Sequence, residues 1–209
     1  IIIMKTYHHG NLKQELIDCA CRLCERDGYT KLSIRSLAKE SGVSQTAPYR
    51  HFKTKEALYA SVATEGFKKL SKAFSIDVSK KITKKHLVEI GCKYIEFGLK
   101  NANTYDLMFG TAVGNFADYP ELLKSANSSY ENLRLSFSKL ANDSDEVVDF
   151  KCITLWSMVH GLVGILRKVQ VIGDEALINP ELGPMSTANV IAGNLEDHLD
   201  KVISGIIKN

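Results

Sequence analysis

Hydrogen-bond donors are concentrated in one short stretch, residues 33–52, near the start of the 209-residue chain. The outward face of a helix there would show amide, hydroxyl, guanidinium and imidazole groups, from Gln45, Thr46, Tyr49, Arg50 and His51. Such groups bind phosphate oxygens and base edges, and a helix that carries them fits the major groove of duplex DNA. The chemistry indicated is nucleic-acid recognition. Packing inside a small helical module is the alternative for Tyr49 and His51.

The spacing around these donors is that of a helix-turn-helix. Its core would be apolar, from Ile34, Leu37, Ala38, Val43 and Phe52. Gly42 suits the left-handed position of the turn, because a glycine adopts it without steric cost. Ser44 would cap a second short helix that runs to residue 52, and the free amides at this helix start suit a phosphate. Pro48 falls in the first turn of that helix, where the loss of one N–H is tolerable.

The elements that must position these residues are helices. Helical periodicity runs almost end to end, and strand patterns are nearly absent. The predicted helices cover residues 11–27, 33–42, 44–52, 54–76, 83–101, 120–140, 145–171 and 186–207. Gly28 would end the first helix, and Ser33 and Thr54 would cap the second and fourth. The sequence therefore predicts an all-α fold, with a Lys-rich linker at residues 77–85.

Composition and charge fit this assignment. Hydrophobic residues make up 44% of the chain and charged residues 24%, which is typical of a globular protein and argues against disorder. Residues 1–60 hold 10 Lys/Arg and 6 Asp/Glu, whereas residues 61–209 hold 17 and 18. A basic end on a neutral body suits a phosphate-binding end, although charge alone leaves chance as an equal explanation.

The first part of the chain resembles the TetR/AcrR family of repressors. The resemblance rests on Gly42-Val43-Ser44, on Tyr49-x-His51-Phe52 and on Lys55-Glu56-x-Leu58, and residues 7–17 resemble the family's first helix. A bulkier aliphatic residue is common where Pro48 stands here. The resemblance implies a helix-turn-helix domain at residues 5–53, a connecting helix at 54–80 and an effector-binding and dimerisation domain at 81–209.

Donor pattern and resemblance together define the predicted DNA contacts: Ser33, Arg35, Ser44, Gln45, Thr46, Ala47, Tyr49, Arg50, His51 and Lys55. Lys55 begins the connecting helix, where members of the family commonly touch phosphate, and a solvated lysine is the alternative. Lys5, His8 and His9 would form either an arm that reaches DNA or a frayed terminus.

The second part of the chain resembles the family's C-terminal domains, in the subgroup marked by a Trp-His-Gly signature. Trp156, His160 and Gly161 carry that signature here. The predicted ligand-binding residues form a mostly apolar set: Tyr94, Phe97, Met108, Phe109, Trp156 and His160. Core packing is the alternative for His160. The apolar stripe of the last helix (Val190, Ile191, Leu195, Leu199, Val202 and Ile206) is predicted to face a second copy of the chain.

The sequence thus predicts a cytoplasmic, homodimeric transcriptional regulator, a repressor that binds a palindromic DNA operator and is released by a small hydrophobic effector. The alternative is a helical ligand-binding or protein-interaction module that does not read DNA. Neither a catalytic set nor a phosphate-binding glycine loop is evident, so no enzyme activity, cofactor or metal is expected.

The remaining features predict neither secretion nor a membrane span. No apolar run approaches the ~18 residues of a membrane helix, and residues 1–3 are too short for a signal peptide and are interpreted as an extension. Five cysteines, an odd number, argue against a disulfide framework. Cys19, Cys21 and Cys24 lie in a helical pattern and are expected to be inert thiols, with a metal or redox site as the alternative.

Overall fold

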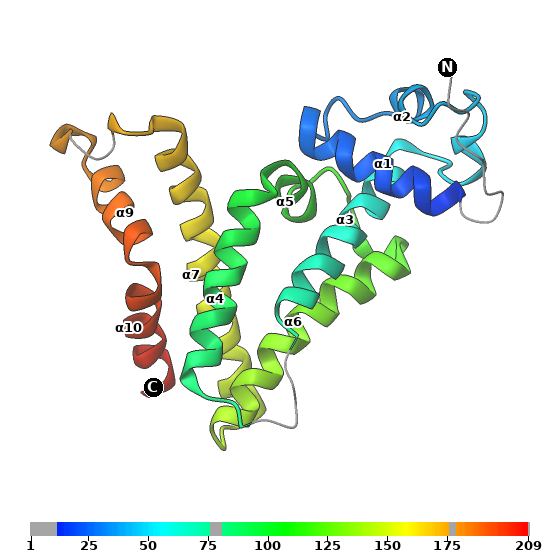
Figure 1. Cartoon of the computed structure of the whole chain (residues 1–209). Helices are drawn as coiled ribbons and strands as arrows, with labels where there is room; N and C mark the ends of the chain where they lie inside the picture. Colours follow the sequence, from blue (N-terminus) through cyan, green and yellow to red (C-terminus); the bar gives the residue numbers. More distant parts are fainter. Residues whose placement is uncertain (1–11, 76–80, 176–178, 209) are drawn as a thin grey trace. The chain divides into compact units, whose positions relative to one another are not determined.

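The computed structural model describes residues 12–75, 81–175 and 179–208, and these residues contain helices and no strands (Figure 1). The predicted all-α fold is confirmed. Residues 1–3 and the predicted arm at Lys5, His8 and His9 lie outside the described residues.

The chain forms two compact units that do not follow the sequence in one cut. Unit 1 combines Ile1–Phe67 with Asn101–Ser125, and unit 2 combines Lys68–Lys100 with Ala126–Asn209. Residues 101–125 therefore belong to the same compact unit as the helix-turn-helix, although they fall within the predicted C-terminal domain at residues 81–209. The functional domain limits themselves stay a prediction.

Unit 1 holds the predicted DNA-binding elements. They are α1 (Leu12–Asp27), α2 (Ile34–Glu40), the 3₁₀ helix η1 (Pro48–Arg50), the first part of α3 (Lys55–Ala73), α5 (Ala102–Phe109) and η2 (Phe116–Asp118). Helix α1 contacts both α2 and α5, and α2 contacts η1. Side chains of Leu16, Leu37 and Leu58 are fully buried between them, so that apolar burial fixes how α1, α2 and α3 pack.

Three predicted helix ends are confirmed. Gly28, at φ +83°, follows α1 and donates its N–H to the Cys24 carbonyl at 2.9 Å. Ser33 caps α2, and Thr54 Oγ1 accepts from the Ala57 N–H at 3.0 Å at the start of α3. Each contact satisfies a backbone group that a helix end leaves without an intrahelical partner. Helix α3 ends at Ala73, short of the predicted limit at residue 76.

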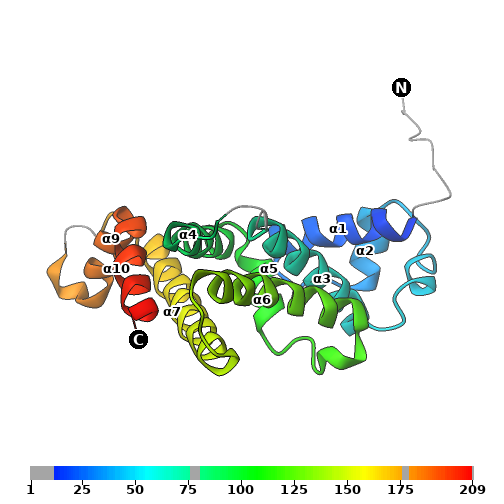
Figure 2. The same cartoon turned by 90° about the horizontal axis from the view of Figure 1, so that it is seen from below.

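Unit 2 is a bundle in which α4 (Lys84–Lys100) lies beside α7 (Asp145–Ile172) and α10 (Leu195–Lys208), as Figures 1 and 2 show. Helix α6 (Pro120–Leu140) continues from unit 1 into unit 2. Gly91 lets α4 approach α10, because a Cβ atom there would lie 3.1 Å from Leu199 Cδ1. Leu199 is 0% exposed, so its predicted place on a face toward a second copy is wrong.

The prediction of the last helix is also wrong, and some short helices were not predicted. Residues 186–207 do not form one helix, since α9 (Pro184–Gly193) and α10 are separated at Asn194. The Asn194 side chain donates to the Val190 carbonyl at 3.2 Å while its backbone leaves the helical region, as asparagine favours at helix ends. The short helix α5, the two-turn element after Asn101, and the 3₁₀ helices η2 and η3 (Pro180–Leu182) were not predicted.

Helix α7 has an exposed apolar face. Phe150, Ile153, Ile165 and Val171 are 69, 47, 42 and 85% exposed, respectively. By length and composition alone this helix could cross a membrane, a test that core helices of soluble proteins also pass, and 39% of the relevant window is buried.

Candidate nucleic-acid interface

Helix α2 begins the candidate interface and is fixed by a reciprocal cap. Ser33 Oγ accepts from the Ser36 N–H at 3.0 Å, and Ser36 Oγ accepts from the Ser33 N–H at 2.9 Å. This capping box holds the start of α2 and leaves Arg35 exposed beside it. Ser33 is half-buried, and its side chain caps α2.

The recognition segment, residues 44–52, is a tight turn that ends in η1. The prediction of a second α-helix there is wrong. The N–H of Ala47 bonds to the Ser44 carbonyl at 3.1 Å, and that of Arg50 to the Ala47 carbonyl at 3.2 Å, both three residues back. Pro48 has no N–H with which to bond four residues back, and the segment takes the tighter 3₁₀ form. Ser44 does not cap it, because Ala47 occupies the N-cap without a side-chain bond.

Burial divides the recognition segment into an anchor and an outward face. Pro48 is buried, and Phe52 is 1% exposed in the core of unit 1. Tyr49 is 49% exposed. The other exposed members of the segment are Ser44, Gln45, Thr46, Arg50 and His51. The predicted donors therefore share one accessible surface even though the helix that was to carry them is shorter.

Lys55 lies at the end of this surface and has contacts of its own. Its side chain is exposed, and its Nζ donates to the Thr30 carbonyl at 3.3 Å and lies 5.2 Å from the centre of the Tyr59 ring. Tyr59 in turn donates its hydroxyl to the Tyr29 carbonyl at 2.6 Å. These contacts fix the turn between α1 and α2 against the first turns of α3.

Three exposed lysines that were not among the predicted DNA contacts lie next to α2 and the recognition segment. Lys31 precedes α2, Lys39 lies in its last turn, and Lys53 follows the recognition segment, and all three are exposed. Their charge and position next to predicted helix ends were signals available in the sequence. Arg26, by contrast, is held in ion pairs with Asp27 and Glu40 at 2.9 and 3.0 Å.

Three of the predicted ligand-binding residues meet inside unit 2. Trp156 Nε1 donates to the Tyr94 hydroxyl oxygen at 3.1 Å, and that hydroxyl lies 3.0 Å from His160 Nδ1. The Tyr94 ring also stacks on Phe74, with centroids 6.0 Å apart. Burial lowers the pKa of His160 below its ordinary value of 6.5, which favours the neutral ring.

The other predicted ligand-binding residues are divided between the two units. Phe97 is buried on α4. Met108 and Phe109 belong to unit 1, where a Cβ on Gly66 would clash with Met108 Sδ and Phe109 packs against Phe67 at 5.4 Å. The structure therefore joins Tyr94, Trp156 and His160 directly, and places Met108 and Phe109 in a second aromatic cluster.

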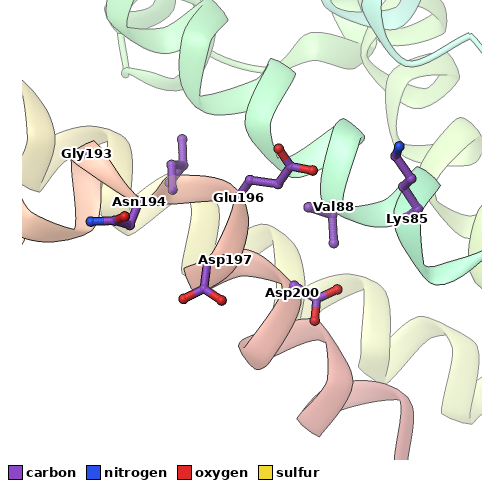
Figure 3. A pocket seen from close by; sticks show the side chains of 8 residues that line it. Lys85, Val88, Gly193, Asn194, Glu196, Asp197 and Asp200 are labelled. Atoms are coloured by element: carbon purple, nitrogen blue, oxygen red, sulfur yellow. The ribbon is translucent and has the colours of Figure 1, made fainter.

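Two pockets of unit 2 contain none of the predicted ligand-binding residues. The first, of about 610 Å³, lies at the break between α9 and α10 (Figure 3). It is lined by Lys85, Val88, Gly193, Asn194, Leu195, Glu196, Asp197 and Asp200. Its carboxylates are partly neutralised, since Asp200 pairs with Lys84 and Asp197 with Lys201, each at 2.7 Å. An apolar groove of about 500 Å³ lies between α7 and α10, beside Phe150 and Val202.

The five cysteines form no disulfide, and two of them, Cys24 and Cys152, are buried thiols with raised pKa values. Burial, with the nearby Glu25 carboxylate, raises the pKa of Cys24 to about 12, and burial raises that of Cys152 to about 12. Such thiols are almost entirely protonated near neutral pH and react slowly. Among the described residues no group of three or more His, Cys, Asp or Glu side chains could hold a metal ion.

A compact helical unit with an exposed, donor-rich turn after a capped helix defines a helix-turn-helix DNA-binding protein. Residues 16–62 match the family described as bacterial regulatory proteins, tetR family, and residues 87–175 match the tetracyclin repressor-like C-terminal domain. Together these matches span more than half of the chain, which belongs to the TetR family of transcriptional regulators. The prediction that the chain is not an enzyme agrees with this family. The Trp-His-Gly subgroup stays a prediction.

Individual relatives are distant in sequence. The chain is similar to two uncharacterised HTH-type transcriptional regulators of Bacillus subtilis (strain 168). It is 22% identical to YobS over 97 residues, 46% of this chain and 51% of the relative. It is 22% identical to YerO over 218 aligned positions, 94% of this chain and 66% of the relative. The chain thus spans about half to two thirds of the length of these relatives.

Solved structures share the fold. A protein of unknown function from Rhodococcus sp. RHA1 superposes with a TM-score of 0.70 at 23% identity, covering 94% of this chain and 97% of that one. A TetR variant from Acinetobacter baumannii AYE in complex with minocycline superposes with a TM-score of 0.61 at 16% identity, covering 94 and 96%.

Proposed function

We propose that this TetR-family regulator is a cytoplasmic repressor that binds a palindromic operator as a homodimer and is released by a small hydrophobic effector. The exposed donors of the recognition segment carry the DNA-binding part of the proposal. Gln45 and Thr46 would read base edges, whereas Arg50, Tyr49 and His51 would contact phosphates. The remaining proposed contacts are Ser33, Arg35, Ser44, Ala47 and Lys55.

The experiment that tests DNA binding is selection of genomic fragments with purified protein, followed by titration at several salt concentrations. We expect a preferred, roughly palindromic site whose half-sites lie about 34 Å apart, one turn of B-DNA. The logarithm of the affinity should fall by about 0.9 per phosphate contact for each unit of log salt concentration. Arg50→Ala should weaken binding to all sequences, whereas Gln45→Ala should relax base preference. Wild-type protein that prefers no fragment over bulk DNA would favour the alternative, a helical module that does not read DNA.

The exposed face of α7 supports a homodimer. Phe150, Ile153 and Ile165 on this face are exposed apolar side chains. Gly161 and Gly164 lie near them, and a Cβ at either glycine would meet no atom within 4 Å. Glycines in mid-helix cost roughly 1 kcal/mol each relative to alanine, and a close approach by a second helix offsets that cost. A two-fold dimer places the same face on both copies.

The group of Tyr94, Trp156 and His160 supports effector binding. It offers aromatic surface and polar atoms within one helical bundle, the combination common in small-molecule sites. The fold shared with a TetR variant that was solved with minocycline supports a small-molecule effector for this chain as well. Binding would tilt α3 and change the separation of the two DNA-binding surfaces.

Fluorescence of Trp156, the only tryptophan, offers a screen of hydrophobic metabolites in the presence and absence of operator. We expect an effector to bind less tightly when operator is bound, and by the same factor that it weakens DNA binding, because linkage is reciprocal. A compound that quenches Trp156 but binds equally well with and without operator would show that the site binds ligands without regulating DNA binding.

A further inference from the structure

Glu56, in the first turn of α3, lies next to the candidate DNA surface and carries the wrong charge for it. It follows Lys55 directly and is half-buried. A carboxylate at this place repels phosphate by simple electrostatics. Its presence in the Lys55-Glu56-x-Leu58 pattern therefore calls for a contact other than DNA.

The contact is with the loop at residues 110–119, which joins α5 to α6 within unit 1. Glu56 Oε1 accepts from the Gly114 N–H at 2.9 Å. The side chains of Glu56 and Thr54 also lie beside the Tyr119 hydroxyl, and burial together with the Glu56 carboxylate raises the pKa of Tyr119. The middle and the end of one loop thus converge on the first turn of α3.

Two further features make this contact specific. A Cβ at Gly114 would lie 3.3 Å from Glu56 Oε1, tighter than most Cβ contacts, so any other residue would displace the carboxylate by a few tenths of an ångström. Phe116, in the middle of the loop, packs edge-on against Phe67 of α3 with centroids 6.1 Å apart. The loop is therefore held along α3 by a polar latch, formed by Glu56 with Gly114 and Tyr119, and by the aromatic contact of Phe116, which lies between those two loop residues in the chain.

The position of the latch connects it to DNA recognition. Thr54, which caps α3 and lies beside Tyr119, is two residues beyond Phe52, the buried anchor of the recognition segment. Displacement of the loop breaks the bond between Gly114 and Glu56 and takes Tyr119 away from Thr54. The first turn of α3 then keeps the contacts of Lys55 and Tyr59 with the turn after α1 but loses those with the loop.

We propose that Glu56 is a positioning residue for DNA binding, which holds the loop at residues 110–119 against the start of α3 and so fixes the recognition segment. The inference rests on the proposed function, because it presumes an operator. It gives the loop a part in DNA binding although the loop contains none of the proposed DNA contacts.

The decisive variant is Glu56→Gln, since the two explanations predict opposite signs. If Glu56 acts only through its charge, its removal should tighten DNA binding. If it latches the loop, operator affinity should fall about five- to tenfold, with an unchanged salt dependence because no phosphate contact is lost. Glu15→Gln is the matched control: it removes an exposed carboxylate from the first turn of α1 in the same unit and should not weaken binding.

Gly114→Ala keeps the loop N–H but places a methyl group against the Glu56 carboxylate, and Tyr119→Phe removes the hydroxyl beside Glu56. Both variants should lower operator affinity, as Glu56→Gln does. They test the latch if Glu56→Gln does not fold. This inference alone would be overturned if the operator affinity of all three variants, Glu56→Gln, Gly114→Ala and Tyr119→Phe, equalled or exceeded that of wild type. Failure of the wild-type protein to bind any operator would overturn the proposed function and this inference with it.

Discussion

His160, Tyr94 and Trp156 form one hydrogen-bonded group in unit 2. The indole N–H can only donate, so the Tyr94 oxygen accepts from Trp156, and that oxygen also lies 3.0 Å from His160 Nδ1. Tyr94 can donate its proton to Nδ1 only when that nitrogen carries none, that is, when the ring is neutral with its proton on Nε2. Burial favours the same neutral form by lowering the pKa of His160.

This arrangement predicts a loss of stability in acid. The folded-state pKa of His160 lies below the ordinary value of 6.5, so the unfolded chain takes up this proton more readily. The histidine therefore costs no stability above about pH 6.5 and destabilises the fold progressively as the pH falls through its folded pKa. Urea unfolding at pH 7.5 and 5.0 should show a larger decrease for wild type than for His160→Asn, whose amide oxygen can still accept from Tyr94. Equal decreases, or an NMR pKa of His160 at or above 6.5, would contradict this account.

Among the helices, α5 depends on a residue that is distant in sequence. Glu25 in the last turns of α1 accepts at Oε2 from the Thr104 N–H at 3.2 Å and from the Thr104 hydroxyl at 2.8 Å. Its backbone carbonyl accepts from the Asn103 side chain at 2.8 Å. Asn101, the N-cap of α5, makes no side-chain cap bond. A carboxylate from α1 thus caps α5, where it also favours the helix dipole.

Glu25→Gln should destabilise the protein by about 1–2 kcal/mol, because a neutral amide replaces a charge-assisted acceptor and turns an N–H toward the N–H of Thr104. Chemical denaturation followed by far-UV circular dichroism measures this change. Glu131→Gln, at an exposed position of α6, is the control and should change stability by no more than ~0.5 kcal/mol. A Glu25→Gln protein as stable as the control would contradict the claim that Glu25 caps α5.

Most helices could be predicted from the sequence because their signals are local. Apolar periodicity, with Gly28 as the end signal of the first helix, defined α1, α6 and α7 to within a residue or two. The recognition segment differs from the prediction, since Pro48 was judged tolerable in the first turn of a helix, whereas the structure has a turn followed by a 3₁₀ helix of three residues, Pro48–Arg50. The break at Asn194 was not predicted, because the apolar pattern of the predicted helix continues on both sides of this residue.

In the candidate DNA-binding surface, too, only the local features could be predicted from the sequence. The exposed donors of the recognition segment follow from residue type and spacing over a few residues. The cap from Glu25 and the latch at Glu56 could not be predicted, because their partners lie 58 to 79 residues away in the chain and depend on how α5 and its following loop pack. Nothing in the local sequence of α1 or α3 indicates those partners.

At the scale of the whole molecule, the proposed homodimer depends on residues other than those first predicted. Leu199 lies in the core beside Gly91, so Leu199→Glu should unfold unit 2 instead of producing a folded monomer. Ile165, 42% exposed beside Gly164, is the better probe.

Ile165→Glu should give folded monomers, because it would bury an unpaired charge at the proposed interface. Light scattering gives the mass, and circular dichroism confirms that the helices remain. Leu123→Glu is a matched control, since Leu123 is 38% exposed on the part of α6 that belongs to unit 1. It should leave the mass of the dimer unchanged. A dimeric Ile165→Glu protein would place the contact between copies on another face.

Unit 1 also sets an order of events during synthesis. Its two segments, Ile1–Phe67 and Asn101–Ser125, are separated by residues that belong to unit 2. At roughly 5–20 residues per second, a ribosome completes the second segment several seconds after the first. Until then Glu25 and Glu56 have no partners from α5 or its loop, and the nascent helix-turn-helix has only its local contacts. A nascent chain that has reached residue 100 therefore already contains every proposed DNA contact, yet it lacks the residues that complete the unit in which those contacts are held.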